Sequence, residues 1–64
     1  MKPYQERVVT EKKELDEKIA KLTAFFKTQT YAEIDQAEAH RLIMQAGAMS
    51  VYSQVLGDRI AAFS

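Results

Sequence analysis

The chain has 64 residues, nine of them basic and nine acidic, so its formal net charge at pH 7 is zero. A zero net charge argues against binding of a nucleic-acid polymer, which normally needs a basic face, and this length allows one small domain, residues 1–64. The chain has no cysteine, so we expect no disulfide, and we expect no metal or cofactor either. It has no apolar run near the roughly 20 residues of a membrane span, and its first residues are polar and charged, so we expect a soluble, intracellular protein.

The first predicted helix covers about residues 3–28. Pro3 suits a first helical turn, where its missing N–H costs no hydrogen bond. Mostly apolar residues then recur three and four positions apart, which places them on one stripe of a helix. The stripe consists of Val8, Lys12, Leu15, Ile19, Leu22 and Phe26.

A break is predicted at about residues 29–35, followed by a second helix over about 36–63. Within the break, Tyr31 and Ile34 either plug the turn end of the hairpin or form one short extra turn. Asp35 followed by Glu38 is typical of a helix N-cap. The second helix has its own stripe, formed by Ala39, Leu42, Ala46, Met49, Ser53, Leu56, Ile60 and Phe63. Two stripes separated by one break predict an all-α fold, a two-helix antiparallel hairpin.

Folding the two stripes together pairs Lys12 with Ser53 as the one polar layer of the seam. An isolated buried ammonium is costly, so Lys12 must pair, extend its head to solvent or meet an anion. One interpretation is that Lys12 covers the core with its stem and keeps its charge in solvent. The other is that it holds an anionic ligand or fixes the register of an oligomer.

The second helix carries another apolar stripe, about 200° around the helix from the first. The first helix covers only one of these faces, so we expect self-association into a helical homo-oligomer. Gly47 and Gly57 lie inside the same helix, where glycine allows a close approach of another helix or of a ligand. The predicted oligomer interface consists of Met44, Ala48, Val51 and Val55, with Ala62 continuing the stripe.

No group of residues has the spacing of a catalytic or metal site, and His40 is the only histidine, so we expect no enzymatic activity. Binding of a phosphorylated ring compound is compatible with the composition, since cations suit phosphates and aromatic rings suit bases. The candidate ligand-binding residues near the open end are Tyr4, Arg7, Lys12, Tyr52, Ser53 and Arg59.

The pattern resembles a family of small proteins encoded by phages and prophages, including those of gut Bacteroides phages. The residues that carry the resemblance cover nearly the whole chain: Tyr4-Gln5-x-Arg7-Val8-x-x-Glu11-x-x-x-Leu15-Asp16-x-Lys18-x-x-x-Leu22, then Gln45, Met49, Tyr52-Ser53 and Leu56-x-x-Arg59-Ile60-x-x-Phe63. Such proteins look similar in architecture to the helical-hairpin part of phage anti-CBASS and anti-Thoeris sponges.

The resemblance implies an oligomer that binds a cyclic nucleotide or cyclic ADP-ribose-like immune signal and keeps it from host effectors without cleaving it. It also implies a location in the cytoplasm of the infected bacterial host. The alternative is a structural or adaptor hairpin that oligomerises and captures a protein partner. This alternative rests on the first helix, which has a dense and balanced set of charges, and on the second helix, which is apolar on two faces. Neither hypothesis involves a membrane or a nucleic-acid polymer.

Overall fold

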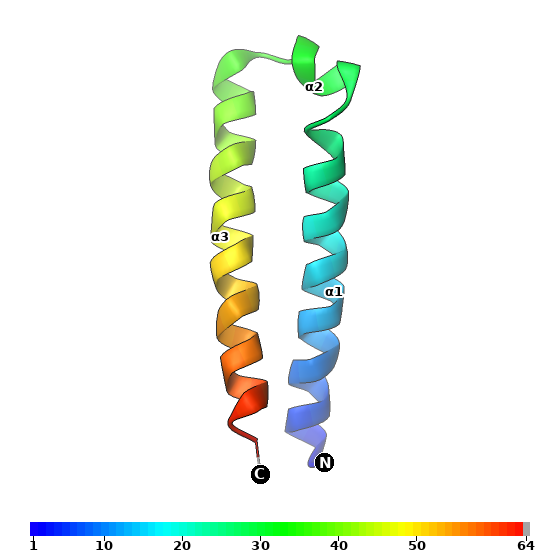
Figure 1. Ribbon diagram of the computed structural model, residues 1–64, viewed down its shortest axis with the longest axis vertical. Coiled ribbons are helices and arrows are strands. Elements are labelled where there is room, and N and C mark those ends of the chain that lie inside the picture. Colours follow the sequence, from blue (N-terminus) through cyan, green and yellow to red (C-terminus); the bar gives the residue numbers. More distant parts are fainter. Residues whose placement is uncertain (64) are drawn as a thin grey trace.

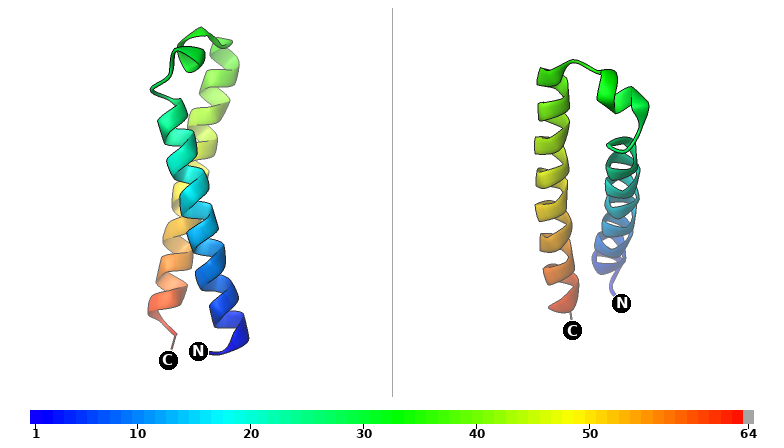
Figure 2. Two further views of the ribbon diagram at one scale, coloured as in Figure 1. Left: turned by 90° about the vertical axis from the view of Figure 1, so that its right-hand side faces the viewer. Right: turned by 45° about the horizontal axis from the view of Figure 1, so that its top comes forward.

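The computed structural model describes residues 1–63 and contains three helices, α1 (Pro3–Phe25), α2 (Gln29–Glu33) and α3 (Gln36–Ala61). All regular structure within these residues is helical, which confirms the all-α prediction. The long helices α1 and α3 run side by side in opposite directions, and α2 joins them at one end (Figure 1). They also cross each other, as the turned view in Figure 2 shows. The molecule measures 47 × 15 × 13 Å, and its two short dimensions correspond to a single layer of two helices.

The link between the long helices is more ordered than a simple break. α1 ends at Phe25, short of the expected residue 28, and Thr28 then caps α2 by accepting the N–H of Tyr31 at 3.2 Å. The Tyr31 ring packs against Phe25 and Phe26, with ring centroids 5.8 and 4.9 Å away. This aromatic cluster fills the turn end of the molecule, and it explains why the segment folds as a short helix.

α3 begins where the sequence places it. Asp35 is the N-cap, and its carboxylate accepts the N–H groups of Ala37 and Glu38 at 3.1 and 3.3 Å. The negative charges of Asp35 and Glu38 near the positive end of the helix dipole strengthen this cap. The helix ends at Ala61, two residues before the predicted end, and Ser64, the last residue of the predicted domain, lies outside the described residues.

The seam between α1 and α3 holds a small core. Val8, Leu15 and Leu56 are buried, and Leu56 is only 1% exposed. Four partly buried apolar residues pack around them, namely Ile19, Met49, Ile60 and Phe63. All seven belong to the two predicted stripes. Three buried apolar side chains are few for a chain of this length, so little of the stability can come from the interior.

Gln5 is a buried residue that the apolar pattern did not reveal. It is 5% exposed, and its Oε1 accepts the backbone N–H of Lys2 at 2.9 Å, an orphan donor of the first turn. Gln5 lies three residues before Val8, so it continues the spacing of the α1 stripe. Its amide meets the hydrogen-bonding need of the helix start at the edge of the core.

None of the three helices within residues 1–63 has both the length and the apolar character needed to cross a membrane.

Replacing Gly47 with Ala is expected to stabilise the isolated pair of helices. A Cβ built at Gly47 meets no atom within 4 Å, so the added methyl group causes no clash. Ala in a helix interior is favoured over Gly by about 1 kcal/mol, which corresponds to a rise of roughly 4–8 °C in melting temperature. Thermal denaturation followed by circular dichroism measures this, and a lower melting temperature would instead identify Gly47 as a point of close packing between chains.

Candidate functional site

The predicted polar layer is a closed cluster of three side chains across the seam. Lys12 Nζ donates to Ser53 Oγ at 2.8 Å and to Asp16 Oδ2 at 3.1 Å. Ser53 Oγ in turn donates to Asp16 Oδ1, so the hydroxyl acts both as acceptor and as donor. The Lys12–Ser53 bond joins residues far apart in sequence and confirms the predicted pairing of these two positions.

The local geometry shows how this polar layer fits into an otherwise apolar seam. Ser53 is buried, whereas the Lys12 side chain remains about one-third exposed. The Lys12 stem lies over Gly57, where a built Cβ would come within 3.5 Å of Lys12 Cε. Of the predicted options for Lys12, the structure therefore shows pairing: its ammonium meets a carboxylate and a hydroxyl of the same chain.

Asp16 is the electrostatic counterpart that the sequence reading did not include. Its pKa lies below the ordinary value of 3.8, first because Ser53 donates a hydrogen bond to the carboxylate and then because Lys12 does, while desolvation opposes the shift. The carboxyl group is therefore ionised at neutral pH. Its position four residues after Lys12 is the spacing of a helical ion pair, and this spacing was the signal that could have identified it.

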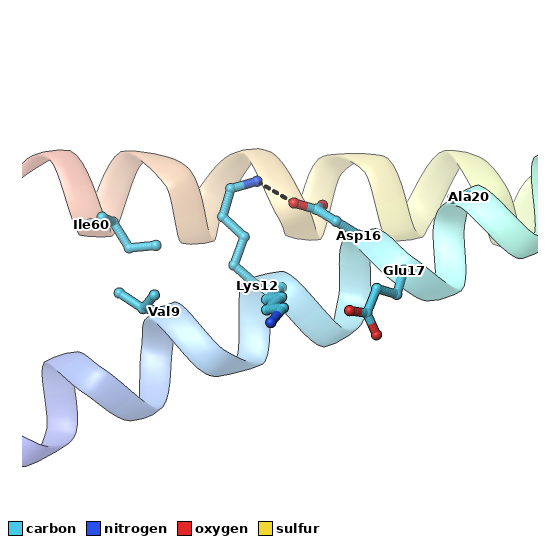
Figure 3. Close-up of a pocket in the computed structure, with 7 residues that line it drawn as sticks. Val9, Lys12, Asp16, Glu17, Ala20 and Ile60 are labelled. Carbon is cyan, nitrogen blue, oxygen red and sulfur yellow. Dashed lines mark hydrogen bonds and ion pairs between the residues drawn. The ribbon is translucent and has the colours of Figure 1, made fainter.

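An open groove of about 490 Å³ lies beside the cluster, between α1 and α3. In Figure 3 the side chains of Val9 and Ile60 face each other near Lys12, and Asp16 and Glu17 lie further along α1. The groove is lined by Val9, Lys12, Lys13, Asp16, Glu17, Ala20 and Ile60, so its two cations are balanced by two carboxylates. A ligand lying there would keep one side in contact with solvent.

The other predicted ligand-binding residues do not join this cluster. Tyr4 packs edge-on against Phe63 at the open end, with ring centroids 5.9 Å apart. Tyr52 and Arg59 are exposed on α3 and lie seven residues apart, hence on one face of that helix. The structure thus brings together two of the six predicted residues, Lys12 and Ser53.

Arg7 lies in a second open groove of about 500 Å³ on α1. That groove is lined by Pro3, Glu6, Arg7, Thr10, Glu11 and Glu14. Three carboxylates around one guanidinium make the local charge negative, which disfavours a phosphate group. Arg7 is therefore poorly placed to serve as the phosphate-binding cation that its residue type suggested.

The described residues form no group of three or more His, Cys, Asp or Glu side chains that is placed to hold a metal ion. A protein-family model described as Sequestin matches residues 2–62, which is nearly the whole chain. No curated protein and no solved structure matches the chain.

Ser53→Ala is expected to lower the melting temperature at pH 7, because it removes the strongest cause of the lowered Asp16 pKa. A carboxyl group with a depressed pKa in the folded state contributes stability above its ordinary pKa and loses it as the pH falls through the folded value. The difference between the variant and the unmodified protein should therefore shrink below about pH 3.8.

The matched control is Ser50→Ala, since the Ser50 hydroxyl bonds only to the Ala46 carbonyl of its own helix. Melting curves at pH 7 and pH 3 for both variants measure the effect. An equal loss for Ser53→Ala at both pH values would show that the cluster contributes no charge-dependent stability.

Proposed function

We propose, because the chain belongs to the Sequestin family, that it binds and withholds a small signalling molecule without transforming it. The observation that carries the proposal is the family match over residues 2–62, since the family name itself suggests sequestration. The resemblance to phage sponges narrows the ligand to a cyclic nucleotide or a cyclic ADP-ribose-like immune signal. In this proposal the protein acts for a phage, in the cytoplasm of the infected host.

Non-covalent capture agrees with the chemistry of the described residues. The pKa of Asp16 is lowered and so lies further from neutrality, whereas a general acid or base works best with a pKa near the operating pH. Lys12 already shares its ammonium with Asp16 and Ser53. This arrangement supports a structural role for the cluster and favours binding over catalysis.

The proposal includes self-association of a two-helix hairpin. The isolated pair of helices buries three apolar residues, and the far face of α3 leaves other apolar side chains in solvent. Met44 is 63% exposed, Val51 61% and Val55 49%. Covering these side chains in an oligomer would supply the apolar burial that the single chain lacks. We place the ligand at the interface between subunits, because the grooves of one chain are open.

A thermal-shift panel of cyclic dinucleotides, cyclic trinucleotides and cyclic ADP-ribose isomers tests the function. A ligand that binds only the folded protein stabilises it by about 2.7 kcal/mol at a hundredfold excess over its Kd, which raises the melting temperature measurably. The linear form of each hit is the matched control. Chromatography of the ligand released by heat should return it intact, and a cleaved product would contradict sequestration.

A double substitution, Val51→Glu with Val55→Glu, is expected to dissociate the oligomer. Two carboxylates placed on the apolar stripe would have to be desolvated in the interface, at a cost that the contact cannot offset. Gln54→Glu is the control for a negative charge added to α3 beside the stripe. Light scattering after size-exclusion chromatography measures the mass, and an unchanged mass for the double variant would exclude this face as the interface.

The second candidate is an adaptor that captures a protein, and the groove beside Lys12 favours it. Val9, Ala20 and Ile60 give this groove an apolar lining bordered by both charges, which suits an amphipathic helix of a partner. This candidate predicts a flat response to the ligand panel from a well-folded oligomer. The same panel therefore distinguishes the two functions.

A further inference from the structure

The four residues of the outer α3 stripe are spaced symmetrically along the helix. The midpoint of this symmetry lies between Met49 and Ser50. Met44 then corresponds to Val55, and Ala48 corresponds to Val51. In a two-fold interface, residue i of one copy contacts residue j of the other, and j contacts i. The stripe has the pattern of a surface that packs against its own copy with the helices antiparallel.

We propose that two copies pair antiparallel through α3 about this midpoint, and that the pair forms a phosphate-binding site to which each copy contributes one arginine. The inference rests on the proposed function, since it supplies the site for the sequestered signal. The pairing places Met44 of each copy against Val55 of the other. It leaves α1 on the outside of each copy, because the buried α3 residues Ser53 and Leu56 face α1 from the opposite side of the helix.

One flank of this pair brings a hydrogen-bond donor of one copy beside an acceptor of the other. His40 and Asp58 are eighteen residues apart, which is five helical turns, so both lie on the same edge of the stripe. In the antiparallel pair His40 of one copy stands almost level with Asp58 of the other. An imidazole N–H can donate to a carboxylate, so this edge favours the pairing at both of its ends.

The other flank brings like charges together. Arg41 and Arg59 are also eighteen residues apart and lie on the opposite edge, both exposed. The pairing sets Arg41 of one copy beside Arg59 of the other, and repeats this at the far end. Two adjacent guanidinium groups repel unless an anion lies between them, and their planar donor pattern suits phosphate oxygens. The like charges thus define a site that is complete only when the ligand is bound.

Neighbouring groups fit a nucleotide at this position. Within residues 1–63, Arg41 is held only by an exposed ion pair with Glu38 at 2.9 Å, which contributes little and leaves the guanidinium free to turn. Tyr52 lies two turns before Arg59 on the same face, about 10 Å along the helix. Its ring is 45% exposed and can stack on a base whose phosphate lies between the arginines. The ligand class is therefore a phosphodiester with a nearby base.

Cysteine crosslinking tests the pairing, because the chain has no native cysteine. Oxidation of Met44→Cys mixed with Val55→Cys should give a disulfide-linked heterodimer, whereas Met44→Cys alone should stay uncrosslinked. Ala48→Cys mixed with Val51→Cys provides a second pair of variants. Crosslinking of Met44→Cys with itself would indicate parallel helices, and no crosslinking in either mixture would overturn the interface.

Subunit mixing tests the shared site, by calorimetry with cyclic di-AMP, cyclic tri-AMP and cyclic ADP-ribose as probes. Arg41→Ala and Arg59→Ala should each weaken binding about tenfold or more, since each removes a charge-assisted contact at both sites. In the mixed dimer one site lacks both arginines and the other has both, so an equal mixture should recover about a quarter of the sites. Lys18→Ala, a change to an exposed cation of α1, is the control.

Failure to recover sites on mixing would overturn the shared site while leaving the proposed function intact. If the unmodified protein binds none of the three probes, the anion site is wrong together with the proposed function. The crosslinking result then decides the α3 pairing independently.

Discussion

A layer of two helices covers only one face of each helix, and this constraint governs the rest of the molecule. Residues 1–63 extend only 15 × 13 Å across the long axis, so within them no further long helix covers the far side of α3. Charged residues solve this problem for α1, most of which is exposed and polar. α3 has no such solution, because Met44, Val51 and Val55 face solvent. Apolar residues in the seam between α1 and α3 are thus covered, whereas those on the outer face of α3 are exposed in the single chain.

The polar layer at Lys12 gives the seam specificity more than strength. Apolar stripes of a regular repeat pack nearly as well when shifted by one heptad, since van der Waals contacts do not distinguish one aliphatic layer from another. A shift that moves Ser53 level with Ile19 would separate it from Lys12 and leave the buried hydroxyl facing an apolar partner. The cost of an unsatisfied buried polar group therefore penalises the wrong alignment. Gly57 contributes to this arrangement by leaving room for the Lys12 stem.

Sequence periodicity was sufficient for the helices, for the α3 cap and for the pairing of Lys12 with Ser53. These features depend on spacing, and spacing can be read without coordinates. It left two alternatives for the segment between the long helices, a plug of the turn or one short extra turn. The structure shows a short helix there, because Thr28 both follows α1 and caps α2. The carboxylates that surround Arg7 come from neighbouring turns of α1, and the residue type of Arg7 alone does not reveal them. Asp16 lies at the edge of the seam and outside the apolar stripe, so periodicity alone does not identify it.

The aromatic cluster at the turn has a kinetic consequence. Phe25, Phe26 and Tyr31 contact one another over a few residues, so their association closes a short loop and costs little chain entropy. Once the turn is formed, each further layer of the seam adds to the one before, towards the open end at Tyr4 and Phe63. A chain with such local contacts folds in microseconds to milliseconds. For two copies that pair as proposed, encounter at low concentration is slower than folding, so the rate at which pairs form would rise with the second power of protein concentration.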